Sequence, residues 1–98
     1  MNIRIELAPG VLDDFERILA HLEKYQVPEP EARIDSILAA IDLLQTSPKI
    51  GRLLADDKRE LVIGTGVQGY VALYCFLAEI KTVLILAVRS QRELVTAS

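Results

Sequence analysis

Hydrophobic and polar residues alternate near the start of the chain, and the pattern then changes to a helical period. Between residues 2 and 8, isoleucine or leucine occupies every second position with arginine and glutamate between them, which is typical of a half-buried strand. Pro9 ends this strand. From there the hydrophobic residues recur at steps of three and four, which predicts an amphipathic helix. Its expected inner face consists of Val11, Phe15, Ile18, Leu22 and Tyr25.

A second amphipathic helix is expected after the segment 27–30, which contains two prolines. Proline is favoured at the first position of a helix, so Pro30 predicts the start, and Ser47-Pro48 predicts the end. Two helices joined by so short a linker are expected to form an antiparallel hairpin. The expected inner face of the second helix consists of Ile34, Ile37, Leu38, Ile41 and Leu44.

Three more strands are expected in the second half of the chain, over residues 59–64, 70–78 and 82–89. A glycine-rich turn at 65–69 and a tight turn at 79–81 connect them. The element order β-α-α-β-β-β predicts a single α+β domain over residues 1–98. In this domain the helical hairpin packs against a mostly antiparallel four-stranded sheet.

Both faces of the expected central strands are apolar, although the two helices can cover only one face of a sheet. The other face needs a cover, which is the C-terminal tail, a second copy of the chain or another protein. If the open face is the one that carries the aromatic side chains, it presents Tyr70, Tyr74 and Phe76 to that partner. Ala39 and Leu43, on the outer side of the second helix, are either scattered surface residues or part of the same docking surface.

Length and composition exclude several classes of protein, among them membrane-spanning and zinc-binding proteins. The chain has 98 residues, of which 51% are hydrophobic, and a formal charge of −3. The longest apolar run, residues 70–78, is too short to cross a bilayer as a helix, and no signal-peptide pattern opens the chain. With one cysteine, the expected location is the cytoplasm without membrane insertion. One histidine and one cysteine are too few soft ligands for a zinc site, so no metal is expected.

Residues 64–69 match the GxGxxG pattern of dinucleotide-binding proteins. That mechanism needs a helix after the glycines to receive the pyrophosphate, whereas a strand is expected here. The glycines therefore indicate a turn, and no cofactor is expected. We interpret His21 as a solvated residue of the first helix and Cys75 as a small buried hydrophobic residue within a strand.

Charge differs between the two halves of the chain. Residues 1–48 carry four basic and nine acidic residues, a sum of −5, and residues 49–98 carry seven and five, a sum of +2. Arginines at strand ends and in loops can converge on one sheet edge and bind carboxylate or phosphate. The alternative is that they pair with neighbouring glutamates and fix the loops. The arginines in these places are Arg52, Arg59, Arg89 and Arg92.

Four stretches of the second half follow a recognisable order: Ile50-Gly51-Arg52, residues 59–64, residues 69–74 and residues 83–93. Together with the element order, they resemble the RelE/ParE toxins of type II toxin–antitoxin modules. The similarity is greatest to the ParE branch, often called plasmid-stabilisation proteins. The resemblance implies a bacterial toxin that forms a complex with a cognate antitoxin, which lays an extended and helical segment along the toxin. It also implies DNA gyrase as the target of ParE-type members and mRNA on the ribosome as the target of RelE-type members.

Within this resemblance, the chain lacks part of the RelE chemistry. RelE-like ribonucleases use basic residues and a His or Tyr near the C-terminus, because a proton must be moved during cleavage. Arg89 matches the last-strand arginine of the family, but Ser90 follows it, and no Tyr or His occurs after Tyr74. The negative net charge also disfavours direct nucleic-acid binding.

We therefore expect a ParE-like toxin that binds and inhibits DNA gyrase and is not an enzyme. Its expected target-binding residues are the four arginines named above. One alternative is a ribosome-dependent endoribonuclease that uses Arg52, Arg59 and Arg89. Another is a non-toxic member of the fold that persists as a complex-forming module.

Overall fold

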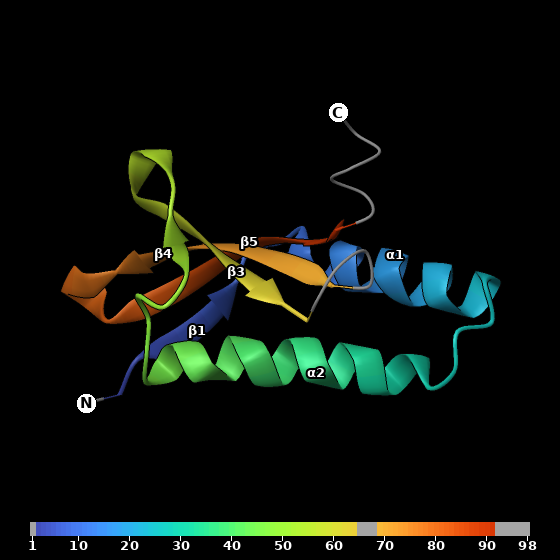
Figure 1. Ribbon diagram of the computed structural model, residues 1–98. Coiled ribbons are helices and arrows are strands. Elements are labelled where there is room, and N and C mark those ends of the chain that lie inside the picture. Colours follow the sequence, from blue (N-terminus) through green and yellow to red (C-terminus); the bar gives the residue numbers. More distant parts are fainter. Residues whose placement is uncertain (1, 65–68, 92–98) are drawn as a thin grey trace.

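The computed structural model describes residues 2–64 and 69–91, which form two helices and one mixed sheet (Figure 1). The sheet has five strands in the order β1-β5-β4-β3-β2, in which β1 is parallel to β5 and the other neighbours are antiparallel. The helices are α1 (Val11–Lys24) and α2 (Pro30–Asp42), and the strands are β1 (Arg4–Leu7), β2 (Arg52–Leu53), β3 (Lys58–Ile63), β4 (Tyr70–Leu77) and β5 (Thr82–Ser90).

The predicted α+β fold class and element order are confirmed, and the number of strands is corrected. The fifth strand, β2, has two residues and pairs with β3 at the edge of the sheet. A segment of two residues is too short to produce an alternating pattern, so this strand could not be predicted from the sequence. The described residues also form three short 3-10 turns: η1 (Leu43–Gln45), η2 (Ala55–Asp57) and η4 (Ala78–Ile80).

The helical hairpin forms as predicted. Gln26 and Glu29 in the linker have φ angles of 54° and 51°, and these left-handed residues help to reverse the chain before Pro30 begins α2. In Figure 1, α2 runs beneath the sheet, and η2, which follows β2, rises above it. Tyr25 falls outside α1 and is exposed, with its ring 4.7 Å from the His21 ring, so it is not part of the inner face.

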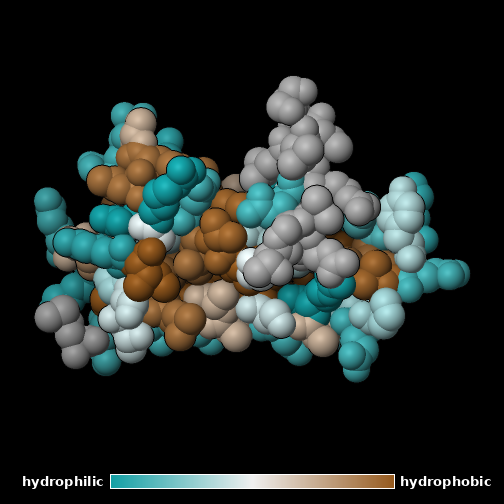
Figure 2. All heavy atoms as spheres, viewed as in Figure 1, coloured by the Kyte–Doolittle hydropathy of each residue, from teal (hydrophilic) through white to brown (hydrophobic). Residues whose placement is uncertain are grey.

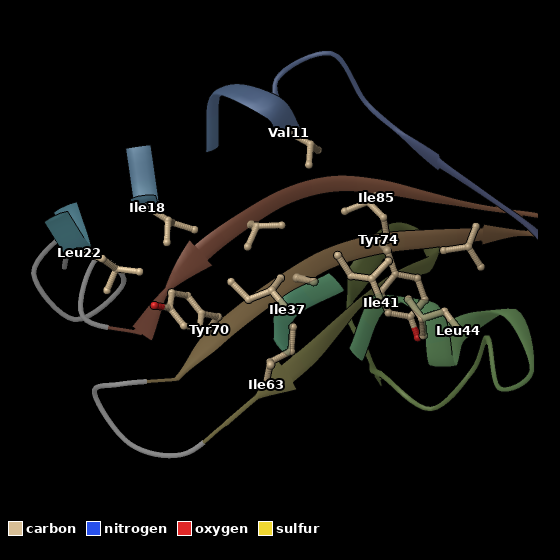
Figure 3. Packing of buried hydrophobic residues seen from close by; sticks show 13 residues of the cluster. Val11, Ile18, Leu22, Ile37, Ile41, Leu44, Ile63, Tyr70, Tyr74 and Ile85 are labelled. Carbon is tan, nitrogen blue, oxygen red and sulfur yellow. The ribbon is translucent and has the colours of Figure 1, made fainter. Parts of the chain in front are cut away.

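The hydrophobic core lies between the helices and one face of the sheet (Figure 3). A bulge keeps β5 aligned with this core: Leu73 pairs with Ala87 and Tyr74 pairs with Ile85, so Leu86 is skipped. Ile85 and Val88 therefore both point into the core although they are three residues apart. The buried residues of the cluster are Val11, Ile18, Leu22, Ile37, Ile41, Leu44, Ile63, Tyr70, Ala72, Tyr74, Val83, Ile85 and Val88.

The aromatic face of β4 is the covered face, which corrects the expectation that it is open. Tyr70 and Tyr74 belong to the buried cluster, and Phe76 packs against it. Their rings provide the volume that fills the space under the helices. The hydroxyl of Tyr74 meets polar partners there, since it accepts a hydrogen bond from the Gly51 N–H at 2.9 Å and donates to the Pro48 carbonyl at 2.8 Å.

Candidate functional site

The side of the sheet that faces away from the buried cluster carries an apolar strip, which we call the open face. Its residues alternate with core residues along each strand, and none of them belongs to the buried cluster. Val62 and Leu77 are 55% and 39% exposed, whereas Val71 is only 8% exposed. The other three residues of the face are half-buried. The open face consists of Val62, Val71, Leu73, Cys75, Leu77 and Leu84.

Charged residues border this strip on both sides. On β3, Lys58 and Glu60 are paired in register with Cys75 and Leu73. On β1, Glu6 is paired in register with Leu84. An apolar centre with a polar rim of both charge signs is the usual composition of a protein-binding surface.

A second, smaller apolar area lies on the helical side of the molecule. Leu38 of α2 and Leu43 of η1 are 42% and 56% exposed, and Ala39 is exposed beside them. The prediction that Leu38 belongs to the inner face of the second helix is therefore wrong, since Leu38 is not part of the buried cluster. Figure 2 shows hydrophobic side chains in several places on the visible surface rather than in a single patch. Ala39 and Leu43 are thus accessible, as the sequence analysis expects.

The structure does not gather the candidate arginines into one cluster. Arg52 is exposed at the β2 edge and forms an ion pair with Glu60. Arg59 is turned toward the preceding loop, where its Nη1 donates to the carbonyls of Lys49 and Gly51 at 3.1 and 2.9 Å. Arg92 lies outside the described residues. Of the alternative interpretation, the pairing with a glutamate is found at Arg52 and the fixing of a loop at Arg59.

Arg59, Tyr74 and Gly51 together hold the loop that leads into β2. The amide of Gly51 donates to the Tyr74 hydroxyl, and its carbonyl accepts from Arg59. A Cβ at position 51 would lie 2.6 Å from the Tyr74 hydroxyl and 2.9 Å from the Glu60 carbonyl. Glycine is therefore required here by close packing against a buried ring.

Replacing Gly51 by alanine is expected to lower the free energy of unfolding by about 1–3 kcal/mol, because the methyl group overlaps buried atoms that have little freedom to move. Urea denaturation measures this difference. Gly10→Ala is the matched control, since a Cβ at Gly10 meets nothing within 4 Å, and its stability should stay close to that of the original protein. Equal stability of the two variants would contradict the close packing at Gly51.

Arg89 meets a buried carboxylate on α1. Its Nη1 lies 2.7 Å from Oδ1 of Asp14, which also accepts from Nη1 of Arg17 at 2.9 Å. The other oxygen of Asp14 accepts the N–H of Val88 at 3.0 Å. Two guanidinium groups and one carboxylate therefore meet at the edge of β5, with a local net charge of +1.

This environment sets the ionisation of Asp14. Burial alone raises the pKa of its carboxyl group, but the hydrogen bond from Val88 and the guanidinium groups of Arg17 and Arg89 outweigh burial, so the pKa lies below its ordinary value. Asp14 is therefore an anion at neutral pH. The role of Asp14 could not be predicted from the sequence, because an acidic residue in the first turns of a helix is common for dipole reasons alone.

Two negative findings concern the described residues. No three His, Cys, Asp or Glu side chains within residues 2–64 and 69–91 are placed to hold a metal ion. In the same ranges, no helix has both the length and the hydrophobicity needed to cross a membrane.

Solved structures of RelE proteins and of a ParDE system have the same fold as this chain. The chain matches a chromosomal ParDE toxin–antitoxin system from P. aeruginosa with a TM-score of 0.71 and 17% identity, over 90% of this chain and 95% of that one. It matches an arginine-to-alanine double mutant of free E. coli RelE with a TM-score of 0.64 and 14% identity, over 99% and 93%. It matches the RelE–RelB complex from Pyrococcus horikoshii with a TM-score of 0.59 and 17% identity, over 93% and 97%.

These similarities show that the chain has the RelE/ParE fold. A match to a family model then assigns the chain to the ParE branch. Residues 5–95 match the model described as the ParE toxin of the type II toxin–antitoxin system, parDE. The chain belongs to this ParE toxin family. No curated protein sequence matches it significantly.

Proposed function

We propose that this protein is a toxin that inhibits DNA gyrase and that an antitoxin encoded beside it keeps it inactive. The observation that carries the proposal is the match to the ParE family over residues 5–95. In this proposal the toxin acts by binding its target rather than by chemistry. Arg52 and Arg89 are its target-binding residues, and Arg59 holds the loop beside Arg52.

The surroundings of Arg89 support binding over RNA cleavage. Metal-free cleavage needs one group that takes a proton from the ribose 2′-OH and one that protonates the leaving oxygen. The carboxylate of Asp14 accepts hydrogen bonds on both oxygens, and its low pKa makes it a poor proton donor at neutral pH. Ser90, the next residue along the chain, has a hydroxyl that does not ionise near neutral pH.

We propose the open face as the antitoxin-binding surface, in place of Tyr70, Tyr74 and Phe76, which the helices cover. An antitoxin strand or helix on the open face would bury its apolar centre and meet charges of both signs at its rim. Arg52 is paired with Glu60 on one side of the open face, and Arg89 is paired with Val71 on the other side. An antitoxin bound to this face would therefore also cover the two target-binding residues. A helical part of the antitoxin could reach Ala39 and Leu43.

Parallel assays of purified protein distinguish the two possible targets. We expect inhibition of gyrase supercoiling on a relaxed plasmid and intact mRNA in a translating-ribosome extract. Codon-dependent cleavage of mRNA that disappears in Arg89→Ala would replace the gyrase proposal by the ribonuclease alternative. Arg33→Ala on α2 is the control for loss of an arginine elsewhere, and it should behave like the original protein in both assays.

A further inference from the structure

The strand β5 continues past the end of its partner β1, and side chains of α1 take the place of that partner. The last paired residues are Leu7 and Ile85, and the N–H of Ala8 still donates to the Ile85 carbonyl at 2.8 Å. At Val88 the main-chain N–H donates to Asp14, and the carbonyl accepts from Nη2 of Arg17 at 3.3 Å. Asp14 is thus fixed to the backbone of the sheet.

The second oxygen of Asp14 then provides a fixed anchor for Arg89. Because Oδ2 is held by the Val88 N–H, Oδ1 has a defined position, and Nη1 of Arg89 lies 2.7 Å from it. The same nitrogen donates to the Val88 carbonyl at 3.1 Å. Among the described residues, the other two nitrogens of this guanidinium have no hydrogen-bond partner, and the side chain is 43% exposed.

We propose that Asp14 is a positioning residue that holds Arg89 by one nitrogen and leaves the rest of its guanidinium ready to bind an anionic group of the target. On a protein target that group is the carboxylate of Asp or Glu, which guanidinium binds through two parallel N–H bonds. An arginine that is already ordered loses less conformational freedom on binding than a free one. This inference rests on the proposed function, since it deepens the role of Arg89 in target binding.

The first experiment needs no target. Nitrogen-15 NMR relaxation of the Arg89 side chain, in the full-length protein, is expected to show restricted motion in the original protein and free motion in Asp14→Asn. Asparagine keeps an oxygen that can accept the Val88 N–H but removes the charge that holds Arg89. If Asp14→Asn does not fold, Asp14→Ser is the replacement variant. Equal motion of Arg89 with and without Asp14 would overturn the proposal.

The second experiment is a double-mutant cycle in which the measured quantity is the inhibition of gyrase. We expect Asp14→Asn to raise the half-inhibitory concentration about tenfold, and Arg89→Ala to raise it further. In the Arg89→Ala background, Asp14→Asn should add no further loss of inhibition. A merely structural role of Asp14 predicts full additivity instead, and that result would overturn the proposal.

The two experiments separate failure of this inference from failure of the proposed function. If the original protein does not inhibit gyrase, the proposed function fails, and the NMR measurement still decides whether Asp14 holds Arg89. If the original protein inhibits gyrase but Arg89→Ala inhibits equally well, Arg89 is not a target-binding residue, and the inference is overturned.

Discussion

Two negative charges on the open face are expected to abolish antitoxin binding. In the double variant Val62→Glu/Leu77→Glu, carboxylates replace side chains that are 55% and 39% exposed on β3 and β4. A carboxylate at these positions is hydrated in the free protein, but a bound antitoxin would exclude that water. An unpaired carboxylate in a dry interface costs several kcal/mol, so the dissociation constant should rise by about 100-fold or more.

Isothermal titration with the product of the adjacent open reading frame measures this effect. Leu12→Glu is the matched control, since Leu12 is 63% exposed and belongs to α1, not to the open face. Its affinity should stay within about threefold of the original, as expected for a substitution at an exposed surface site. Unchanged affinity of the double variant, with its fold verified by circular dichroism, would place the antitoxin elsewhere on the toxin.

Asp14→Ala is expected to give the largest loss of stability among the charged residues. The change leaves the N–H of Val88 without its acceptor and removes the counter-charge of Arg17 and Arg89. We expect the free energy of unfolding at neutral pH to fall by about 2–3 kcal/mol, which is below the cost of breaking a fully buried ion pair because both arginines are partly solvated. Urea denaturation measures the difference.

The same group predicts a pH dependence of stability with a definite sign. The pKa of Asp14 is lowered in the folded state, so its contribution to stability is complete above the unfolded-state pKa of about 3.9 and is lost as the pH falls through the lower folded-state value. The stability difference between the original protein and Asp14→Asn should therefore be constant from neutral pH to about pH 5 and shrink below it. A difference that grows on acidification would contradict this account of Asp14.

Most of the fold could be predicted from local patterns. The change from a period of two to a period of three and four marks the first strand and helix, and Pro30 marks the start of α2. The element order then allowed few arrangements of helices and sheet. The edge strand β2 was missed because two residues are too few to form an alternating pattern, and because the loop before it is held by Tyr74, which is 23 residues from Gly51 in sequence.

The candidate site was harder to predict, because its features depend on contacts between distant parts of the chain. Both faces of β4 are apolar, and only the packed structure shows that the larger rings of Tyr70 and Tyr74 fill the helix side. Asp14 and Val88 are 74 residues apart in sequence, and neither has a pattern that indicates the pair. The sequence did place Arg89 at the end of a strand, which the structure confirms.

The most direct test of the account is a titration of purified gyrase with this protein, with and without the product of the adjacent open reading frame. We expect that the protein alone inhibits supercoiling of a relaxed plasmid and that stoichiometric addition of the neighbouring protein restores supercoiling. Supercoiling that stays unchanged at a large excess of the toxin, in a preparation whose fold is verified, would contradict the assignment of gyrase as the target.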